Sequence, residues 1–437
     1  DLLMQFGFWS LVPPILTIAL ALLTKNVFVS LVIGILTGSF VLNAFSPLVS
    51  INAGIYAIAE SMSTGNTLII ASCLIIGAVI HLMEISGGID GFVNVVVKNR
   101  GFIKTKRGAN LFTWGLGLAV FTSGSLSCMV TGAVSRPVND ALKVPHEKSA
   151  FLVHTTSTPW CVLFPFSGWL ASMAGYLVSG GVAEESAVSV LFQSLSFNFY
   201  CILAILLTLV ISLTQKDFGP MAKAEKRAAE LGQLDDPAHV HAEEAEMKAV
   251  SNAKPRACNL LVPIGVLIAV VFAALLITGN GNITKGAGIQ ALIWAVVCSL
   301  VTILVMVIAQ KVFTLDEAIR EMFKGMSSML PIAFVLLLGF TMGNVVKALD
   351  TGSYLSALFQ RFLSPAMLPA LTFLIALLIS FATGTSMGTM AIMAVIALPM
   401  AMDMGTSIPL VAGAMFGGSI FGDHCSPISD TTIMTCS

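Results

Sequence analysis

Charged residues are scarce in this sequence, and their scarcity excludes an ordinary soluble domain. Asp, Glu, Lys and Arg make up 10% of the 437 residues and hydrophobic residues make up 56%, whereas charged residues are about 25% of a soluble globular protein. The mean hydropathy of +0.92 indicates that lipid surrounds most of the chain. The formal net charge of −1, without a concentrated basic patch, does not favour binding to nucleic acid.

Motifs of several other protein classes are also missing from the sequence. There is no Walker-type phosphate loop, no potassium-filter sequence and no Ser-His-Asp or metal-ligand spacing, so we expect neither an ATP-driven pump nor an enzyme, and no cofactor. The eight cysteines form no CxxC pair and lie mostly in apolar runs, which is typical of buried packing residues. No cleavable signal precedes the first apolar run, so this run is expected to act as its own insertion signal, and both chain ends are expected to be trimmed.

Apolar runs that can cross a hydrocarbon core of roughly 30 Å recur along the whole chain. Two further segments, 109–141 and 366–402, each contain two shorter apolar arms around a small polar tip. We expect re-entrant hairpins there, with two thin transmembrane helices in each segment as the alternative. The fold class is therefore an all-α polytopic membrane protein with about 11 spans or more. The predicted full spans are 8–23, 27–45, 66–85, 149–180, 188–214, 258–278, 286–309, 326–347 and 409–434.

Lys and Arg residues in the loops predict the orientation of the chain. A cluster follows the third span, and alternation places the charged linker 215–256 on the same, cytoplasmic side. The expected location is a cell membrane, as a multi-pass protein of the bacterial cytoplasmic membrane. The clustered residues are Lys98, Arg100, Lys104, Lys106 and Arg107.

Motifs in residues 1–214 recur in the same order in residues 257–437, about 260 residues later. An odd number of predicted crossings separates equivalent elements, so the halves are expected to have opposite orientations. Each half would contain one hairpin and one broken helix, which is the architecture of secondary transporters. The hairpins are 109–141 and 366–402, and the broken helices are 149–180 and 409–434. The paired motifs are 11–15 and 261–264, 121–125 and 381–385, and 156–159 and 424–427.

The polar tips and the interrupted spans are the predicted sites for a cation and a proton. Backbone and hydroxyl oxygens exposed at membrane depth are hard ligands that suit Na⁺. Carboxylates at that depth cost several kcal/mol unless they are paired, hydrated or neutralised, so Asp423 and Asp430 are the leading candidates. Helix packing, relief of proline kinks and capping of helix ends are the alternative roles. The predicted residues are Ser123, Gly124, Ser125, Thr155, Thr156, Ser157, Thr158, Thr383, Gly384, Thr385, Ser386, Asp423, Ser426, Ser429, Asp430 and Thr431.

Three further polar or aromatic side chains are candidates for contact with a substrate. His154, Trp160 and His424 lie beside the predicted interruptions. Ordinary hydrogen-bonded or packed core residues are the alternative interpretation for each of them.

Residues 422–432, which read GDHCSPISDTT, resemble the NhaC family of Na⁺/H⁺ antiporters. The resemblance implies membership of a wider group of transporters that use paired re-entrant hairpins and elevator-type motion. It also implies Na⁺ coupling through Asp423, Ser426, Asp430 and Thr431. One departure is that residues 154–161, HTTSTPWC, carry no carboxylate where family members repeat the motif in the first half.

The function that these observations favour is Na⁺-coupled secondary transport, as Na⁺/H⁺ antiport by an elevator-type alternating-access mechanism. Na⁺-coupled transport of an amino acid or small organic acid is the alternative, because a neutral, hydroxyl-rich first half suits such a solute. The expected partners are Na⁺ and H⁺ or a small organic solute, together with the lipid bilayer. Homodimer formation is left open.

Overall fold

Most of the residues that the computed structural model describes are helical, and the described residues are 6–97, 103–121, 124–164, 167, 169–236, 254–282, 286–351, 354, 364–427, 429, 431–432 and 435. No strand is assigned within these ranges, which confirms the all-α class. The first half contains η2 (Gly7–Leu11), α1 (Val12–Thr24), α2 (Val27–Leu42), α3 (Pro47–Glu60), α4 (Thr64–Ile85), α5 (Gly88–Val97), α6 (Lys106–Ala119), α7 (Gly124–Ala141), α8 (His146–Leu163), α9 (Leu170–Ser179), α10 (Glu184–Leu195) and α11 (Phe199–Thr214). The rest contains α12 (Gly219–Leu231), α13 (Cys258–Thr278), α14 (Gly288–Ala309), α15 (Leu315–Ser328), α16 (Leu330–Ala348), η5 (Pro365–Met367), α18 (Leu368–Thr383), α19 (Ser386–Asp403) and α20 (Ile408–Cys425).

Within the described residues, 8 helical stretches are long and apolar enough to cross a membrane, so the chain is a polytopic membrane protein. The predicted total of about 11 spans stays a prediction. Two predicted spans are divided in the structure, 149–180 into α8 and α9, and 188–214 into α10 and α11. The 8 stretches are Gly7–Thr24, Thr64–Ile85, Glu184–Leu231, Cys258–Thr278, Gly288–Ala309, Leu330–Ala348, Pro365–Thr383 and Ser386–Asp403.

The helix that carries Pro159 does not break at that residue. α8 continues through Pro159 to Leu163, and its end is marked by the extended conformation of Phe164, with φ −83° and ψ 105°. The predicted interruption at 156–159 is therefore wrong. A proline inside a helix removes a single hydrogen-bond donor, whereas the residue before a proline is disfavoured in the helical conformation. Because Phe164 precedes Pro165, the helix ends there.

α20 ends in the same way at the other interrupted span. Its last residue is Cys425, and Ser426 is extended with φ −81° and ψ 123°. Ser426 precedes Pro427, so the same steric restriction applies. The predicted interruption at 424–427 is confirmed, whereas the interruption in the first half lies at Phe164 instead of Thr158-Pro159.

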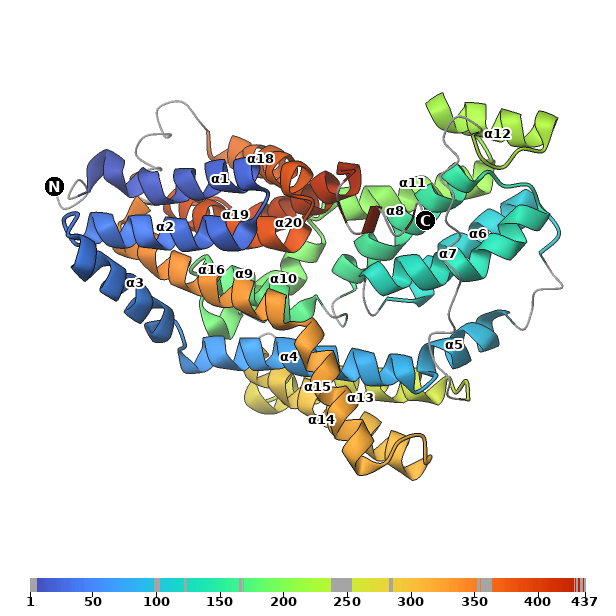
Figure 1. Ribbon diagram of the computed structural model, residues 1–437, viewed down its shortest axis with the longest axis horizontal. Helices are drawn as coiled ribbons and strands as arrows, with labels where there is room; N and C mark the ends of the chain where they lie inside the picture. The colour runs from blue at the N-terminus through green and yellow to red at the C-terminus, as the bar shows by residue number, and fades with distance from the viewer. Residues whose placement is uncertain are drawn as a thin grey trace.

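Two pairs of adjacent helices occupy the segments predicted to be hairpins. α6 and α7 contact each other and pack against α8, while α18 and α19 contact each other and pack against α20. In Figure 1 the α6–α7 pair forms the right-hand end of the molecule, whereas α18 and α19 lie on the left-hand side. The first residue of α7, Gly124, and the first residue of α19, Ser386, both line the cavity described below.

Close contact between α18 and α20 depends on glycine. A Cβ atom at Gly422 would lie 2.2 Å from the carbonyl oxygen of Leu377, and one at Gly418 would lie 2.4 Å from the carbonyl oxygen of Phe373. Small residues at helix interfaces allow backbones in a membrane to approach closely. Because glycine has no side chain, these two positions allow α20, which carries Asp423, to pack closely against α18.

We expect Gly422→Val to separate α20 from α18 and to lower the stability of the protein by about 1–3 kcal/mol, the usual cost of overpacking. Thermal unfolding in detergent would measure the change. Gly115→Val in α6 is the matched control, because a Cβ atom there would meet nothing within 4 Å. Equal stability of the two variants would contradict the proposed role of Gly422.

Candidate functional site

A cavity of about 550 Å³ lies where segments from both halves of the chain meet. Its other walls include the loop between α1 and α2, with Lys25, and the junction of α15 and α16, with Pro331. The polar and glycine residues that line it are widely separated in sequence. Those from the predicted site are Gly124, Thr158, Thr385, Ser386, Asp423 and Thr431.

The first helix pair reaches the cavity through the start of α7. A Cβ atom at Gly124 would lie 3.2 Å from Thr158 Oγ1, so this tip contacts the middle of α8 directly. Ser123 lies outside the described residues, and so does the side chain of Ser125. Gly124 is thus the described contact between the first tip and the polar part of α8.

The hydroxyl groups of α8 fall into two kinds. All four predicted residues are buried, but Thr156 Oγ1 donates to the Leu152 carbonyl oxygen at 2.6 Å and is satisfied by its own helix. Ser157 Oγ and Thr158 Oγ1 have no hydrogen-bond partner among the described residues. Of these four residues, Thr158 is the one among the lining residues of the described cavity. A buried hydroxyl without a partner is costly in an apolar interior, and a bound polar ligand would relieve that cost.

The second tip is a tight turn that ends α18 and begins α19. Gly384 has φ +66°, a left-handed conformation that favours glycine. Thr385 caps α19 by accepting a hydrogen bond from the Gly388 N–H, and Thr383 Oγ1 donates to the Ile379 carbonyl oxygen at 2.8 Å. Thr385 and Ser386 line the cavity, while the hydroxyl of Thr383 is held by its own helix.

The end of α20 and the segment after it bring the Asp423 carboxylate and the Thr431 hydroxyl to the same cavity. Asp423 is 3% exposed and lines the cavity together with Thr431. Ser429 Oγ and Thr431 Oγ1 lie 3.0 Å apart, and Ser426 Oγ is buried without a hydrogen-bond partner among the described residues. Asp430 lies outside the described residues.

Two histidines lie beside the cavity and contact each other. The rings of His154 and His424 are 4.2 Å apart, and His154 Nε2 is 3.1 Å from Thr431 Oγ1. The Tyr200 hydroxyl lies 2.9 Å from His424 Nδ1. Trp160 instead lies 5.9 Å from the ring of Phe164 and is not among the cavity-lining residues of the described chain. His154 and His424 therefore contact the candidate site, whereas Trp160 does not.

Sequence reasoning missed several residues of this region. Tyr200 is one of 4 tyrosines in the chain and lies in an apolar run. A single tyrosine in such a run is only a weak indication of a functional residue. Tyr176 of α9 also lines the cavity. No motif marks these residues, because only the packing of α9 and α11 against other helices brings them to the site.

Comparison with protein families gives a match over residues 160–437 to the Na⁺/H⁺ antiporter family. An uncharacterised protein of Haemophilus influenzae is 30% identical over 98% of this chain and 84% of its own length. The malate-2H⁺/Na⁺-lactate antiporter of Bacillus subtilis is 38% identical over 18% of this chain and 16% of its own length.

Two further similarities are more limited. The arginine/ornithine antiporter ArcD of Halobacterium salinarum is 34% identical over 17% of this chain and 15% of its own length. The structure of MtrF from Neisseria gonorrhoeae, described as illuminating a class of antimetabolite efflux pumps, has a TM-score of 0.49 and 12% identity, covering 88% of this chain and 78% of that one. The match over 160–437 includes most of the chain, and it confirms the resemblance of the segment GDHCSPISDTT: this protein belongs to the Na⁺/H⁺ antiporter family of membrane transport proteins.

Proposed function

We propose that the protein is a Na⁺-coupled secondary transporter that exchanges Na⁺ for H⁺ across the bacterial cytoplasmic membrane. The observation that carries this proposal is the shared cavity. Among the described residues, one carboxylate and hydroxyls from α8, the start of α19 and the segment after α20 line it, and so does Gly124 at the start of α7. The family match supports transport by antiport.

The chemistry of the lining suits Na⁺ as the transported cation. Hydroxyl, carbonyl and carboxylate oxygens are hard donors, which hard cations prefer to sulfur or imidazole. Asp423 would supply the negative charge that balances the ion, with Thr158, Thr385 and Thr431 as neutral ligands. Within the described residues no three His, Cys, Asp or Glu side chains gather as a metal cluster, so the proposed site depends on hydroxyl and main-chain oxygens.

Exchange follows from the cost of charge at membrane depth. An ionised Asp423 without a counter-ion is unfavourable there, so either Na⁺ or H⁺ should occupy the site at any time. The two loaded forms have the same net charge, and each is suited to cross the barrier. The empty site carries the negative charge of Asp423 and is not suited to cross the barrier. Because only the loaded forms cross, the flux of Na⁺ in one direction is coupled to the flux of H⁺ in the other.

The arrangement of the helices suggests how the site would move. The two helix pairs lie toward opposite ends of the molecule, and each packs against an interrupted helix, α8 or α20. We propose that residues 1–214 and 257–437 are inverted repeats joined by the cytoplasmic linker 215–256. The two pairs with α8 and α20 would carry the cation across the bilayer in an elevator-type motion.

A reconstituted system tests the antiport directly. Proteoliposomes that contain a pH-sensitive dye should show proton movement when a Na⁺ gradient is imposed, and the movement should reverse with the gradient. Empty liposomes and liposomes given a K⁺ gradient are the controls. Na⁺ entry without any proton counterflow would overturn the proposal of Na⁺/H⁺ exchange.

A second candidate function is Na⁺-coupled transport of a small organic acid or amino acid. Thr158 lines the cavity together with Asp423, and His154 contacts Thr431 there, so a zwitterion or anion could complete such a site. The short matches to malate/lactate and arginine/ornithine antiporters support testing these solutes. Uptake of labelled lactate, malate or arginine that depends on a Na⁺ gradient would favour this function.

A further inference from the structure

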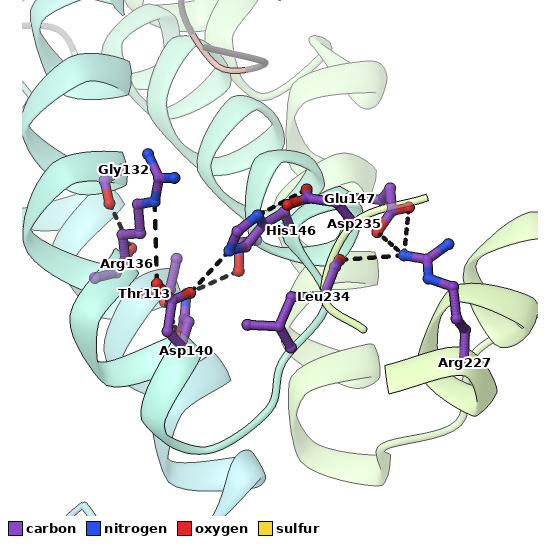
Figure 2. A network of polar contacts seen from close by, with 12 residues as sticks. Thr113, Gly132, Arg136, Asp140, His146, Glu147, Arg227, Leu234 and Asp235 are labelled. Carbon is purple, nitrogen blue, oxygen red and sulfur yellow. Dashed lines mark hydrogen bonds and ion pairs between the residues drawn. The ribbon is translucent and has the colours of Figure 1, made fainter. Parts of the chain in front are cut away.

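Two regions outside the cation cavity differ in character. The first is polar, and Figure 2 shows His146 there between Asp140 and Asp235. Beside it, Arg227 donates hydrogen bonds to both carboxylate oxygens of Glu147, at 2.7 and 2.9 Å. These side chains pair with one another and hold the linker against α7 and α8. The second region is a pocket of about 480 Å³ between the junction of α10 and α11, α18 and α20.

The lining of this pocket is apolar. Of the described residues that line it, none is charged. The Tyr200 hydroxyl is the polar side-chain group among them, and it lies 2.9 Å from His424 Nδ1. An ion or a zwitterion would lose its hydration in this pocket without gaining a charged partner. The pocket therefore does not suit the solutes considered for the cation cavity.

Glycines on α20 create the hollow. A Cβ atom at Gly417 would lie 3.5 Å from Tyr200 Cβ and 3.6 Å from Phe373 Cε2, and one at Gly413 would lie 2.7 Å from Phe197 Cβ. Glycine at position 413 thus allows the junction of α10 and α11 to approach α20 closely. Glycine at position 417 leaves room between the rings of Tyr200 and Phe373, so the pocket has aromatic walls.

The junction of α10 and α11 presents two further rings. Asn198 caps α11 by accepting a hydrogen bond from the Cys201 N–H at 3.2 Å, and its ψ of 69° turns the chain. Phe197 and Phe199 flank this cap, with their ring centroids 6.4 Å apart and their planes at 82°. This edge-to-face arrangement is a favourable one for aromatic pairs. The helix break therefore brings two packed aromatic rings to the wall of the pocket.

The rim of the pocket belongs to a surface that suits lipid. It includes residues of α11 and α18, and both helices lie in stretches that are long and apolar enough to cross a membrane. Two of the lining side chains are exposed although they are apolar, namely Phe199, which is 57% exposed, and Leu374, which is 55% exposed. Leu203 and Leu378 extend this exposed apolar surface along the same two helices. Exposed apolar surfaces of this kind contact hydrocarbon in a membrane protein, so the pocket faces acyl chains.

The volume of the pocket fits one hydrocarbon chain. An apolar cavity of about 150 Å³ holds a benzene-sized molecule, so a pocket of about 480 Å³ has room for a chain of roughly a dozen carbon atoms or more. Because lipid tails are as apolar as the pocket, the chain would gain from close packing against the rings and not from leaving water. Among the described lining residues there is no lysine or arginine that would bind a carboxylate or phosphate. The head group of a lipid would therefore stay outside, and only its chain would enter.

We propose that this pocket binds one acyl chain of a membrane phospholipid and that the chain acts on the cation cavity through Tyr200. The Tyr200 ring lines the pocket and stacks on Phe421, with centroids 4.8 Å apart. Its hydroxyl contacts His424, which follows Asp423 directly in α20. A chain that packs against Tyr200 thus contacts the side chain that positions His424 beside the cavity. The binding of the chain is independent of the proposed function, whereas its effect on Na⁺ rests on that function.

Photolabelling of the full chain tests the binding. The protein would be reconstituted in phosphatidylethanolamine and phosphatidylglycerol liposomes that contain a phosphatidylethanolamine with a diazirine in one acyl chain. After illumination, mass spectrometry should find several-fold more label on the pocket residues of α18 and α20 than on the exposed face of α13. Ala370→Trp, which adds an indole to the lining, should remove this excess. Ala269→Trp, at an exposed alanine of α13, is the matched control and should keep it.

Two outcomes of this experiment would overturn the proposal. Equal labelling of the pocket in the wild type and in a folded Ala370→Trp protein would show that the chain does not occupy the pocket. Labelling by a free fatty acid that carries the diazirine, but not by the phospholipid, would show that the occupant is wrongly assigned. Size-exclusion chromatography would establish that both tryptophan variants remain folded.

The Na⁺ dependence of transport tests the link through Tyr200. Tyr200→Phe keeps the ring and should keep the photolabel, but it removes the hydroxyl that contacts His424. We expect it to raise the Na⁺ concentration for half-maximal transport several-fold, with a maximal rate within about twofold of the wild type. Ala370→Trp should raise this concentration too, whereas Ala269→Trp should not.

The transport results separate the two proposals. Wild-type half-saturation in folded Tyr200→Phe and Ala370→Trp proteins would overturn the action of the chain on the cation cavity. If the pocket is labelled as expected but no protein, including the wild type, transports Na⁺, the proposed function fails and the acyl-chain site stands.

Discussion

Replacing Asp423 with asparagine is expected to abolish Na⁺-coupled transport. Asn has nearly the same shape but cannot balance the charge of Na⁺ or release a proton. Charge compensation at membrane depth is worth several kcal/mol. Each 1.4 kcal/mol added to the activation free energy lowers a rate about tenfold. The transport rate should therefore fall by about 100-fold or more. Uptake of radioactive Na⁺ into proteoliposomes would measure the loss.

A matched substitution separates this effect from general damage. Asp316→Asn makes the same chemical change on an exposed face of α15, remote from the residues that line the cavity, and should leave transport unchanged. Size-exclusion chromatography would show whether both variants remain folded. Wild-type Na⁺ uptake by a folded Asp423→Asn protein would remove Asp423 from the proposed mechanism.

Lys148→Met is expected to destabilise the attachment of the linker helix α12 by about 3–5 kcal/mol, the usual cost of removing one partner from a buried ion pair. Lys148 Nζ lies 2.8 Å from Asp217 Oδ2 and 3.0 Å from Glu225 Oε1, and its side chain is 0% exposed. Met fills a similar volume but leaves the buried Asp217 carboxylate without its cation. Hydrogen exchange of α12 in the detergent-solubilised protein would report the change.

Lys226→Met is the control for this prediction. Lys226 lies on α12, is 73% exposed and faces Glu230 at 3.8 Å, so its loss should cost less than about 1 kcal/mol. The double variant Lys148→Met, Asp217→Asn should recover part of the protection, because it removes the uncompensated charge. If Lys148→Met and Lys226→Met have equal effects, the buried pair does not stabilise the linker.

The candidate residues could be selected from the sequence because they are polar, charged or glycine residues within apolar segments. Asp423 interrupts an apolar run, and Gly384 with its polar neighbours forms a tip that no membrane core would otherwise contain. Such violations are visible in the sequence, since lipid penalises polar groups wherever they occur. Gly124, Thr158 and Asp423 line the same cavity, and their role in binding a cation stays a prediction.

The position of the first helix break could not be chosen correctly from the motif alone. Pro159 and Pro165 both lie in the same apolar run, and either could end a helix. The structure retains Pro159 inside α8, where one missing hydrogen bond is tolerated, and ends the helix at Phe164. Similarity to the segment around Pro427 therefore predicted the interruption at the wrong proline, because the extended conformation is found at Phe164 and not at Thr158.

The amino-acid sequence was sufficient for the properties that act locally and at every residue: the helical class, the membrane environment, the polar tips and the buried carboxylate. Only the structure shows which hydroxyls are satisfied by their own helix, as at Thr156, and which have no hydrogen-bond partner among the described residues, as at Thr158. Tertiary packing also decided that Lys148 is buried between two carboxylates and that His146 joins Asp140 to Asp235. Local rules reflect the interaction of each segment with lipid or water, whereas these contacts join residues far apart in sequence and exist only once the helices have packed.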